Sequence, residues 1–204
     1  MQTTGGAVGE ALQEDHGAES SRQPRVVHFA TPWGVGWFRL ANGRLVEISL
    51  AEDHFAREAG RGLATKGSED RTGELHEVSG GEGSGDPGLL WRRRLEAYFE
   101  DPRTWSPGNF ELDGLGLTRF QRDVYEALLT VPAGETVSYG ELARLAGYPG
   151  AARAVGSAMA ENPLPLVIPC HRVVRSDGSL GRYGRCDALK EHLLRLEGAL
   201  GQEE

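Results

Sequence analysis

The feature that most constrains this chain is an apolar segment at residues 162–174 that contains Pro163, Pro165 and Pro169. Proline fixes φ near about −65° and has no backbone N–H, so it disrupts helices and central strands alike. We therefore expect an extended and rigid segment. It leads directly into Cys170 and His171, which places a thiol beside an imidazole at a fixed point of the fold.

The thiol of Cys170 is the candidate nucleophile. A cysteine reacts as its thiolate, which a neighbouring base or cation favours. The adjacent candidates for that influence are His171, Arg172 and Arg175. The alternative is a buried and inert cysteine, which is the commoner role of a single thiol. Cys186 has no adjacent histidine, so we expect it to be inert.

Composition indicates a protein that keeps its thiols reduced. No apolar run approaches the roughly 20 residues that span a bilayer, and residues 1–24 have no apolar stretch typical of an export signal. We expect a cytoplasmic protein without a membrane segment and without a disulfide. The cysteines and histidines do not have the spacing of metal ligands, so no metal is expected.

The charge of the chain is distributed unevenly. A net charge of −8 argues at first against nucleic acid, because Lys and Arg bind its phosphates. Between Leu142 and Leu196, however, eight Lys and Arg stand against four Asp and Glu. Charge therefore does not exclude nucleic acid as a partner of the C-terminal half.

Composition and periodicity divide the chain into three parts. Residues 1–24 have the composition of a disordered tail, and residues 25–115 form an N-terminal α/β domain with a flexible insertion at 59–88. Residues 116–200 form a C-terminal domain. The predicted class is α+β, with a small antiparallel sheet and a helix, followed by a mainly helical domain that contains a helix-turn-helix.

The N-terminal domain is predicted from alternating apolar residues and one turn signal. Strands are expected at residues 26–30, 35–40 and 45–50. Asn42-Gly43, between the last two strands, is a strong type I′ hairpin signal. A helix is expected at 89–100.

Three helices are predicted in the C-terminal domain. Residues 118–121 have the capping-box pattern and precede a helical period that predicts a helix at 119–130. Residues 138–141 form a second box, which opens a short helix through Leu145, and a third helix follows at 151–160. Two short helices with a tight turn are the outline of a DNA-binding helix-turn-helix. The alternative is a helical hairpin without a nucleic-acid role.

The Pro-Cys-His-Arg-Val segment at 169–173 is similar to the active-site signature of the O6-alkylguanine-DNA alkyltransferases, also called methylated-DNA–protein-cysteine methyltransferases. Further motifs follow in the family's order: Thr-x-Phe-Gln at 118–121, Gly-Glu-Thr-Val-Ser-Tyr at 134–139, Ala-Ala-Arg-Ala-Val-Gly at 151–156, Asn-Pro at 162–163 and Gly-x-Tyr at 181–183. The resemblance covers residues 117–198. The N-terminal domain resembles the family's variable first domain in topology alone.

The resemblance implies direct reversal of DNA damage, in which an alkyl group moves irreversibly from O6 of guanine to Cys170, once per molecule. His171, working through a water and oriented by Glu191, would take the thiol proton. Asn162 would brace the turn beneath the thiol, and Tyr139 would supply a proton to the purine ring. No cofactor is implied. The N-terminal half has no cysteine, so the zinc site that some relatives carry there is not expected.

The resemblance also implies contacts to the damaged base. The carbonyls of Cys170 and Val173 would accept from its exocyclic amine, and the loop at Tyr183 and Gly184 would close over the ring. The other expected pocket residues are Met159, Pro165 and Arg185. The family commonly has small residues after the pocket tyrosine, so Arg185 is a departure that either narrows the pocket or contacts a phosphate.

A base inside duplex DNA cannot reach a buried thiol, so the nucleotide must be extruded. Arg153 resembles the family's arginine finger, which enters the vacated stack from a helix in the minor groove. The small residues that permit this close approach are Ala151, Ala152, Ala154 and Gly156. The implied partner is double-stranded DNA containing O6-alkylguanine, bound by a monomer.

Three other functions fit parts of the pattern. An alkyltransferase-like protein binds the lesion without chemistry. In such a protein another residue replaces the reactive cysteine, whereas this chain has Cys170. A transcription regulator would need a sensor or effector domain, and none is visible in the sequence. A cysteine hydrolase would need an oxyanion loop, whose signature the sequence also lacks.

Overall fold

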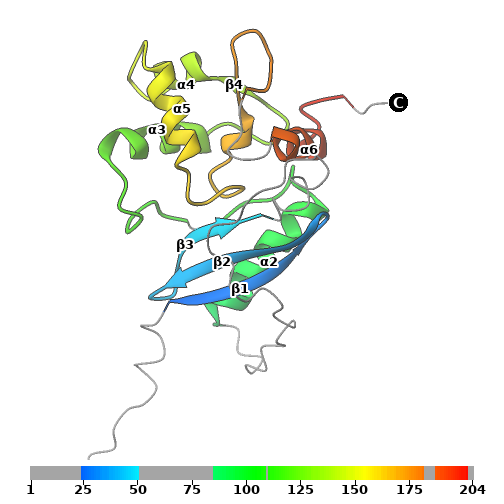
Figure 1. Ribbon diagram of the computed structural model, residues 1–204. Helices are drawn as coiled ribbons and strands as arrows, with labels where there is room; N and C mark the ends of the chain where they lie inside the picture. Colours follow the sequence, from blue (N-terminus) through cyan, green and yellow to red (C-terminus); the bar gives the residue numbers. More distant parts are fainter. Residues whose placement is uncertain (1–23, 51–84, 109, 182–186, 202–204) are drawn as a thin grey trace, which may run out of the picture.

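The chain folds into two layers, which lie one above the other in Figure 1. The structure, a computed structural model, describes residues 24–50, 85–108, 110–181 and 187–201. The N-terminal layer is a small antiparallel sheet with one helix, and the C-terminal layer is a group of short helices. This arrangement confirms the predicted α+β class.

The sheet has the strand order β1-β2-β3 and is antiparallel throughout. Its strands are β1 (Arg25–Thr31), β2 (Gly34–Ala41) and β3 (Arg44–Ser49). Asn42 and Gly43 have φ angles of 51° and 73°. Both lie in the left-handed region that a type I′ turn requires, so the predicted hairpin is confirmed.

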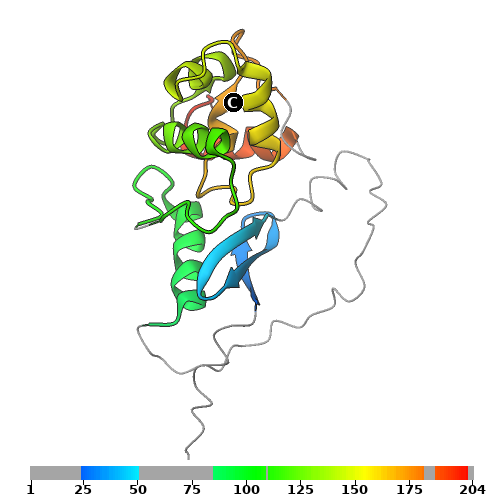
Figure 2. The same ribbon diagram turned by 90° about the vertical axis from the view of Figure 1, so that its left-hand side faces the viewer.

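Helix α2 (Pro87–Glu100) covers one face of the sheet, as Figure 2 shows. It begins at Pro87 because the Asp86 carboxylate caps it, accepting from the Gly88 N–H at 3.0 Å. The insertion expected at 59–88 therefore ends earlier than predicted, because residues 87 and 88 are helical. Its part up to residue 84 lies outside the described residues.

Three helices of the C-terminal layer agree with the predicted helices to within one residue. They are α3 (Arg119–Leu129), α4 (Tyr139–Leu145) and α5 (Ala152–Ala160). The Thr118 hydroxyl accepts from the Gln121 N–H at 3.2 Å, and the Gln121 side chain accepts from the Thr118 N–H at 3.0 Å. The capping box is therefore confirmed.

Two features of this layer were not predicted. Helix α6 (Asp187–Glu197) closes the layer and buries one face against it. Strand β4 (Val137–Ser138) pairs in parallel with β5 (Val173–Val174). Strands of two residues have no sequence period, so only the tertiary structure reveals this pairing.

The two layers share one hydrophobic core, to which both contribute buried side chains. A backbone hydrogen bond also joins them, because the Ile48 N–H of β3 donates to the Pro163 carbonyl at 2.8 Å. The proline segment is therefore held against the edge of the sheet. Within the described ranges, no helix is both long enough and apolar enough to cross a membrane.

Gly36 of β2 provides a test of this packing. A Cβ at Gly36 would lie 2.8 Å from Phe29 Cζ and 2.9 Å from the Ser49 carbonyl. We expect Gly36→Ala to lower the free energy of unfolding by about 1–3 kcal/mol, measured by urea denaturation. Gly140→Ala in α4 is the control, because nothing lies within 4 Å of that position and alanine favours a helix. A Gly36→Ala protein as stable as the parent would contradict the packing described.

Candidate active site

The Cys170 thiol lies at the end of the proline segment, where the chain turns into the 3₁₀ helix η1 (Cys170–Arg172). The residue is only 5% exposed. The Asn162 Nδ2 donates to Sγ at 2.9 Å and to the Ile168 carbonyl at 2.8 Å, while Asn162 Oδ1 accepts from the Leu164 N–H at 2.9 Å. One side chain thus closes the loop and presents an N–H to the sulfur, which favours the thiolate.

The backbone on both sides of the thiol is constrained. Leu166 is buried and has a φ of 72°, a conformation that costs a non-glycine residue about 1–3 kcal/mol and persists only where the surroundings impose it. After η1 the chain enters β5, whose pairing with β4 brings in Tyr139, the first residue of α4. The thiol is therefore held between a strained loop and a strand pair.

His171 is fully buried beside the thiol-bearing residue. Its Nε2 lies 2.9 Å from Glu197 Oε1 and 3.4 Å from the Tyr98 hydroxyl. Because an ionised carboxylate accepts, we assign the ring proton to Nε2, which leaves the Nδ1 lone pair available. No protein atom among the described residues bonds to Nδ1. Burial lowers the pKa of His171 against the opposing effect of Glu197, so the ring is neutral at pH 7 and can accept a proton.

Glu197 gathers the polar side chains around it into what we call the Glu197 cluster: Glu197, His171, Arg172 and Tyr98. Arg172 donates from Nε to Oε2 at 2.9 Å and from Nη2 to Oε1 at 2.8 Å, and the Tyr98 hydroxyl donates to Oε1 at 2.7 Å. Burial raises the pKa of Glu197, but the hydrogen bonds and charges of His171 and Arg172 outweigh it and hold the pKa well below its usual range. The cluster therefore contains a buried carboxylate anion.

Glu191, expected from the sequence to orient His171, does not contact it in this structure. Its side chain is 43% exposed, and its carboxylate accepts from Arg195 at 2.8 Å, one turn along α6. Glu197 occupies the expected position instead. The helical period could have indicated Glu197, because Leu193 precedes it by one turn and both lie on the buried face of α6.

Lys190 is a second buried cation, and no motif in the sequence indicated its position. Its Nζ donates to the Val173 carbonyl at 2.5 Å and to the Leu180 carbonyl, and lies 5.9 Å from the centre of the Tyr139 ring. Burial lowers the pKa of Lys190 to about 8. Burial first, and the charge of a Cys170 thiolate second, raise the pKa of Tyr139, so its hydroxyl stays protonated.

The residues expected to meet DNA lie in and just before α5. Arg153, in the first turn of this helix, is exposed. Of the small residues around it, Ala154 is exposed, whereas Ala151, Ala152 and Gly156 are half-buried. The opposite side of α5 packs into the core through Val155 and Ala158. The structure thus places four of the five residues at the N-terminal end of α5, and Gly156 at its middle.

The expected base pocket is described only in part. Met159 and Pro165 are half-buried, while Tyr183, Gly184, Arg185 and also Cys186 lie outside the described residues. The expected roles of these residues stay predictions. In the part of the chain that the structure describes, no three His, Cys, Asp or Glu side chains are grouped so as to hold a metal ion.

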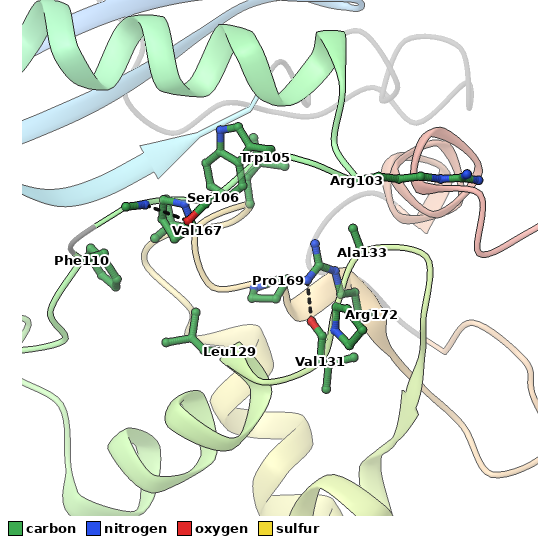
Figure 3. Close-up of a pocket in the computed structure, with 14 residues that line it drawn as sticks. Arg103, Trp105, Ser106, Phe110, Leu129, Val131, Ala133, Val167, Pro169 and Arg172 are labelled. Atoms are coloured by element: carbon green, nitrogen blue, oxygen red, sulfur yellow. Dashed lines mark hydrogen bonds between the residues drawn. The ribbon is translucent and has the colours of Figure 1, made fainter.

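A cavity of about 420 Å³ borders the Glu197 cluster between the chain that follows α2 and the C-terminal layer. In Figure 3, Trp105 and Arg103 line the cavity from the chain after α2, and Pro169 and Arg172 line it from the C-terminal layer. The dashed line at Arg172 marks its 2.6 Å bond to the Val131 carbonyl. Cys170 is not one of the described residues that line this cavity, so a molecule in it would contact the cluster arginine and not the thiol.

Comparison with known sequences identifies similar proteins. Residues 119–199 match the family described as "6-O-methylguanine DNA methyltransferase, DNA binding domain". The methylated-DNA–protein-cysteine methyltransferase of Mus musculus is 49% identical over 130 residues, which are 60% of this chain and 61% of that protein. Its counterpart from Mycobacterium bovis is 44% identical over 126 residues, which are 61% of this chain and 74% of that protein. The chain thus spans about 61% of the length of the mouse relative.

Solved structures are similar across both layers. The crystal structure of Mycobacterium tuberculosis OGT in complex with DNA has a TM-score of 0.61 and 34% identity, covering 85% of this chain and 92% of that one. The O6-methylguanine-DNA methyltransferase of Pyrococcus kodakaraensis strain KOD1 has a TM-score of 0.53 and 27% identity, covering 86% and 99%. These shares are too large for the C-terminal layer alone, so the similarity includes the N-terminal layer.

The two glutamates of α6 provide a direct test of the Glu197 cluster. Glu197→Gln leaves the buried Arg172 guanidinium without a charged partner, so we expect the free energy of unfolding at pH 7 to fall by about 3–5 kcal/mol. The matched control, Glu191→Gln, breaks a partly exposed pair with Arg195 and should cost less than about 0.5 kcal/mol. Both values come from urea denaturation, and equal losses in the two variants would refute the distinction between them.

Proposed function

Because the chain belongs to the methylated-DNA–protein-cysteine methyltransferase family, we propose that it repairs DNA by moving an alkyl group from O6 of guanine to Cys170. The observation that carries the proposal is the buried thiol, which accepts from the Asn162 amide at 2.9 Å. It adjoins a buried imidazole whose Nδ1 bonds to no protein atom of the described residues. Such surroundings activate a cysteine for nucleophilic attack. The DNA complex of a structural relative supports DNA as the partner.

The reaction begins with loss of the thiol proton. A water between Sγ and His171 Nδ1 passes the proton to the ring, because a buried ring nitrogen requires a hydrogen-bonding partner. The Glu197 carboxylate holds the Nε2–H and stabilises the imidazolium that forms. The Asn162 N–H stays on the sulfur as negative charge develops there. Glu197 thus takes the role first expected of Glu191.

The thiolate then attacks the alkyl carbon in line with the departing O6. A sulfur–carbon bond forms as the carbon–oxygen bond breaks, and the electron pair moves onto the guanine. Tyr139 supplies a proton to the purine ring, so the base leaves neutral, and the proton on His171 later restores the tyrosine through solvent. The carbon of the resulting thioether is a poor electrophile, so Cys170 acts once.

The damaged nucleotide reaches the thiol by extrusion from the duplex. Arg153 supports this step because it is exposed in the first turn of α5, where it can enter the vacated stack. Its small neighbours let the helix backbone approach the minor groove closely. A monomer is sufficient for this arrangement, and we place the protein in the cytoplasm.

Recognition of guanine is assigned to backbone carbonyls. Those of Cys170 and Val173 accept from its exocyclic amine, and Lys190 Nζ, which donates to the Val173 carbonyl, holds that carbonyl in place. Further contacts come from Met159 and Pro165, and from the loop with Tyr183, Gly184 and Arg185. Amine donors that meet fixed carbonyls distinguish guanine from bases without that amine.

Intact-protein mass spectrometry tests the proposed transfer. After incubation with duplex DNA containing O6-methylguanine, we expect each molecule to gain one methyl group, mapped to Cys170. Cys170→Ala should lose transfer but keep lesion binding, because the helices supply affinity and the thiol supplies chemistry. Cys186→Ala is the control and should transfer fully. More repaired guanine than protein, or a methyl group on Cys186, would contradict the proposal.

The proposed role of Arg153 predicts a difference between substrates. Arg153→Ala should slow repair of duplex DNA at least about tenfold, while reaction with free O6-benzylguanine changes little, because a free base needs no extrusion. Single-turnover rates on both substrates measure this. Arg39→Ala, which removes an exposed arginine of β2 from its pair with Glu47, should leave both rates unchanged. Equal slowing on both substrates would exclude a role in extrusion.

A further inference from the structure

We propose that Tyr98, on α2 of the N-terminal layer, is a positioning residue that tunes the base strength of His171 through Glu197. The inference rests on the proposed function, in which His171 is the base. The Tyr98 side chain is fully buried, and its hydroxyl donates to Glu197 Oε1 at 2.7 Å and lies 3.4 Å from His171 Nε2. Tyr98 therefore acts through Glu197 and not on the sulfur.

The ring of Tyr98 is enclosed by aromatic neighbours. Its centroid lies 5.2 Å from that of Phe99 and 5.4 Å from that of Trp105, and both neighbours are nearly perpendicular to it, at 89°. Trp105 is in turn anchored by its indole N–H, which donates to the Arg94 carbonyl at 2.5 Å. The His171 ring completes the enclosure at 6.5 Å. The hydroxyl direction is therefore set by aromatic packing in the N-terminal layer.

Three donors share one oxygen of the carboxylate. The Tyr98 hydroxyl, His171 Nε2 and Arg172 Nη2 all lie within 2.9 Å of Glu197 Oε1. Each donor stabilises the negative charge and leaves less of it to interact with the others. Loss of the Tyr98 hydroxyl would therefore strengthen the attraction between Glu197 and a protonated His171, and would make His171 the stronger base.

The titratable and charged groups that face His171 determine the direction in which its pKa moves. They are Glu197 and Lys190 from α6, Arg172 and Cys170 from η1, and Tyr98 from α2. Burial, Arg172 and Lys190 lower the pKa of His171, whereas Glu197 raises it. Burial first and Glu197 second raise the pKa of Tyr98 well above its usual value, so Tyr98 stays a neutral donor while His171 titrates.

The N-terminal layer thereby takes part in the chemistry of the C-terminal motif. Besides the Tyr98 bond, Arg103, which follows α2, donates from Nε to the Glu197 backbone carbonyl at 3.3 Å. Both the side chain and the main chain of Glu197 are thus bonded to residues outside the C-terminal layer. A layer that contains none of the reacting atoms sets the pH range in which the thiol is activated.

Tyr98→Phe removes the hydroxyl and keeps the ring. The acid limb of the pH profile for single-turnover methyl transfer should move to higher pH by about half to one unit, because His171 becomes harder to deprotonate. The His171 titration followed by NMR should move with it. Tyr125→Phe is the matched control: it also removes a buried hydroxyl, which donates to the Ala158 carbonyl at 2.6 Å, and should leave both midpoints unchanged.

A second variant separates tuning from folding. Tyr98→3-fluorotyrosine keeps the hydroxyl and the packing but is the stronger donor, so both midpoints should move to lower pH. A lowered plateau rate with unchanged midpoints in Tyr98→Phe would show a merely structural role and overturn the inference, as would an equal shift in Tyr125→Phe. If the parent protein transfers no methyl group, the proposed function fails. The NMR titration still decides the role of Tyr98 in that case.

Discussion

The buried negative charge of Glu197 connects elements that are far apart in the sequence. A carboxylate anion removed from water is tolerated only where it is paired and hydrogen-bonded on both oxygens. Tyr98 reaches it from α2, His171 and Arg172 reach it from η1, and α6 carries it. Displacing any of these elements would leave the charge under-compensated, so their relative positions are restricted. The imidazole beside the thiol is held by the same restriction.

The thiol itself is positioned by short-range constraints. Prolines stiffen the chain that leads to it, the Asn162 side chain bonds to both ends of the loop, and Leu166 is held in a left-handed conformation. Because η1 then continues into β5, the backbone at Cys170 cannot shift without disturbing the pairing with β4. The proposed nucleophile and the proposed base are thus fixed by two sets of contacts, one local and one between layers.

The residues proposed for chemistry are buried and the one proposed to enter DNA is exposed, but a short stretch of chain joins them. The Tyr125 hydroxyl of α3 donates to the Ala158 carbonyl and fixes α5 to the layer beneath, while Arg153 remains exposed. Helix α5 ends at Ala160, and Asn162, which bonds to the thiol, follows almost at once. A helix placed on DNA in the proposed manner therefore has the reactive sulfur at its C-terminal end, within reach of an extruded base.

The sequence by itself determined the features that depend on neighbouring residues: the capping box at 118–121, the type I′ turn at Asn42-Gly43, and a thiol and an imidazole at the end of a proline segment. Its motifs also identified the family. Only the tertiary structure decided which groups meet around His171. Glu191 and Glu197 lie on the same helix, but the face of α6 that packs inward selects Glu197. Tyr98 bonds to Glu197 from the other layer. Neither contact could be predicted, because the partners of a buried charge depend on packing between distant segments, which local sequence does not encode.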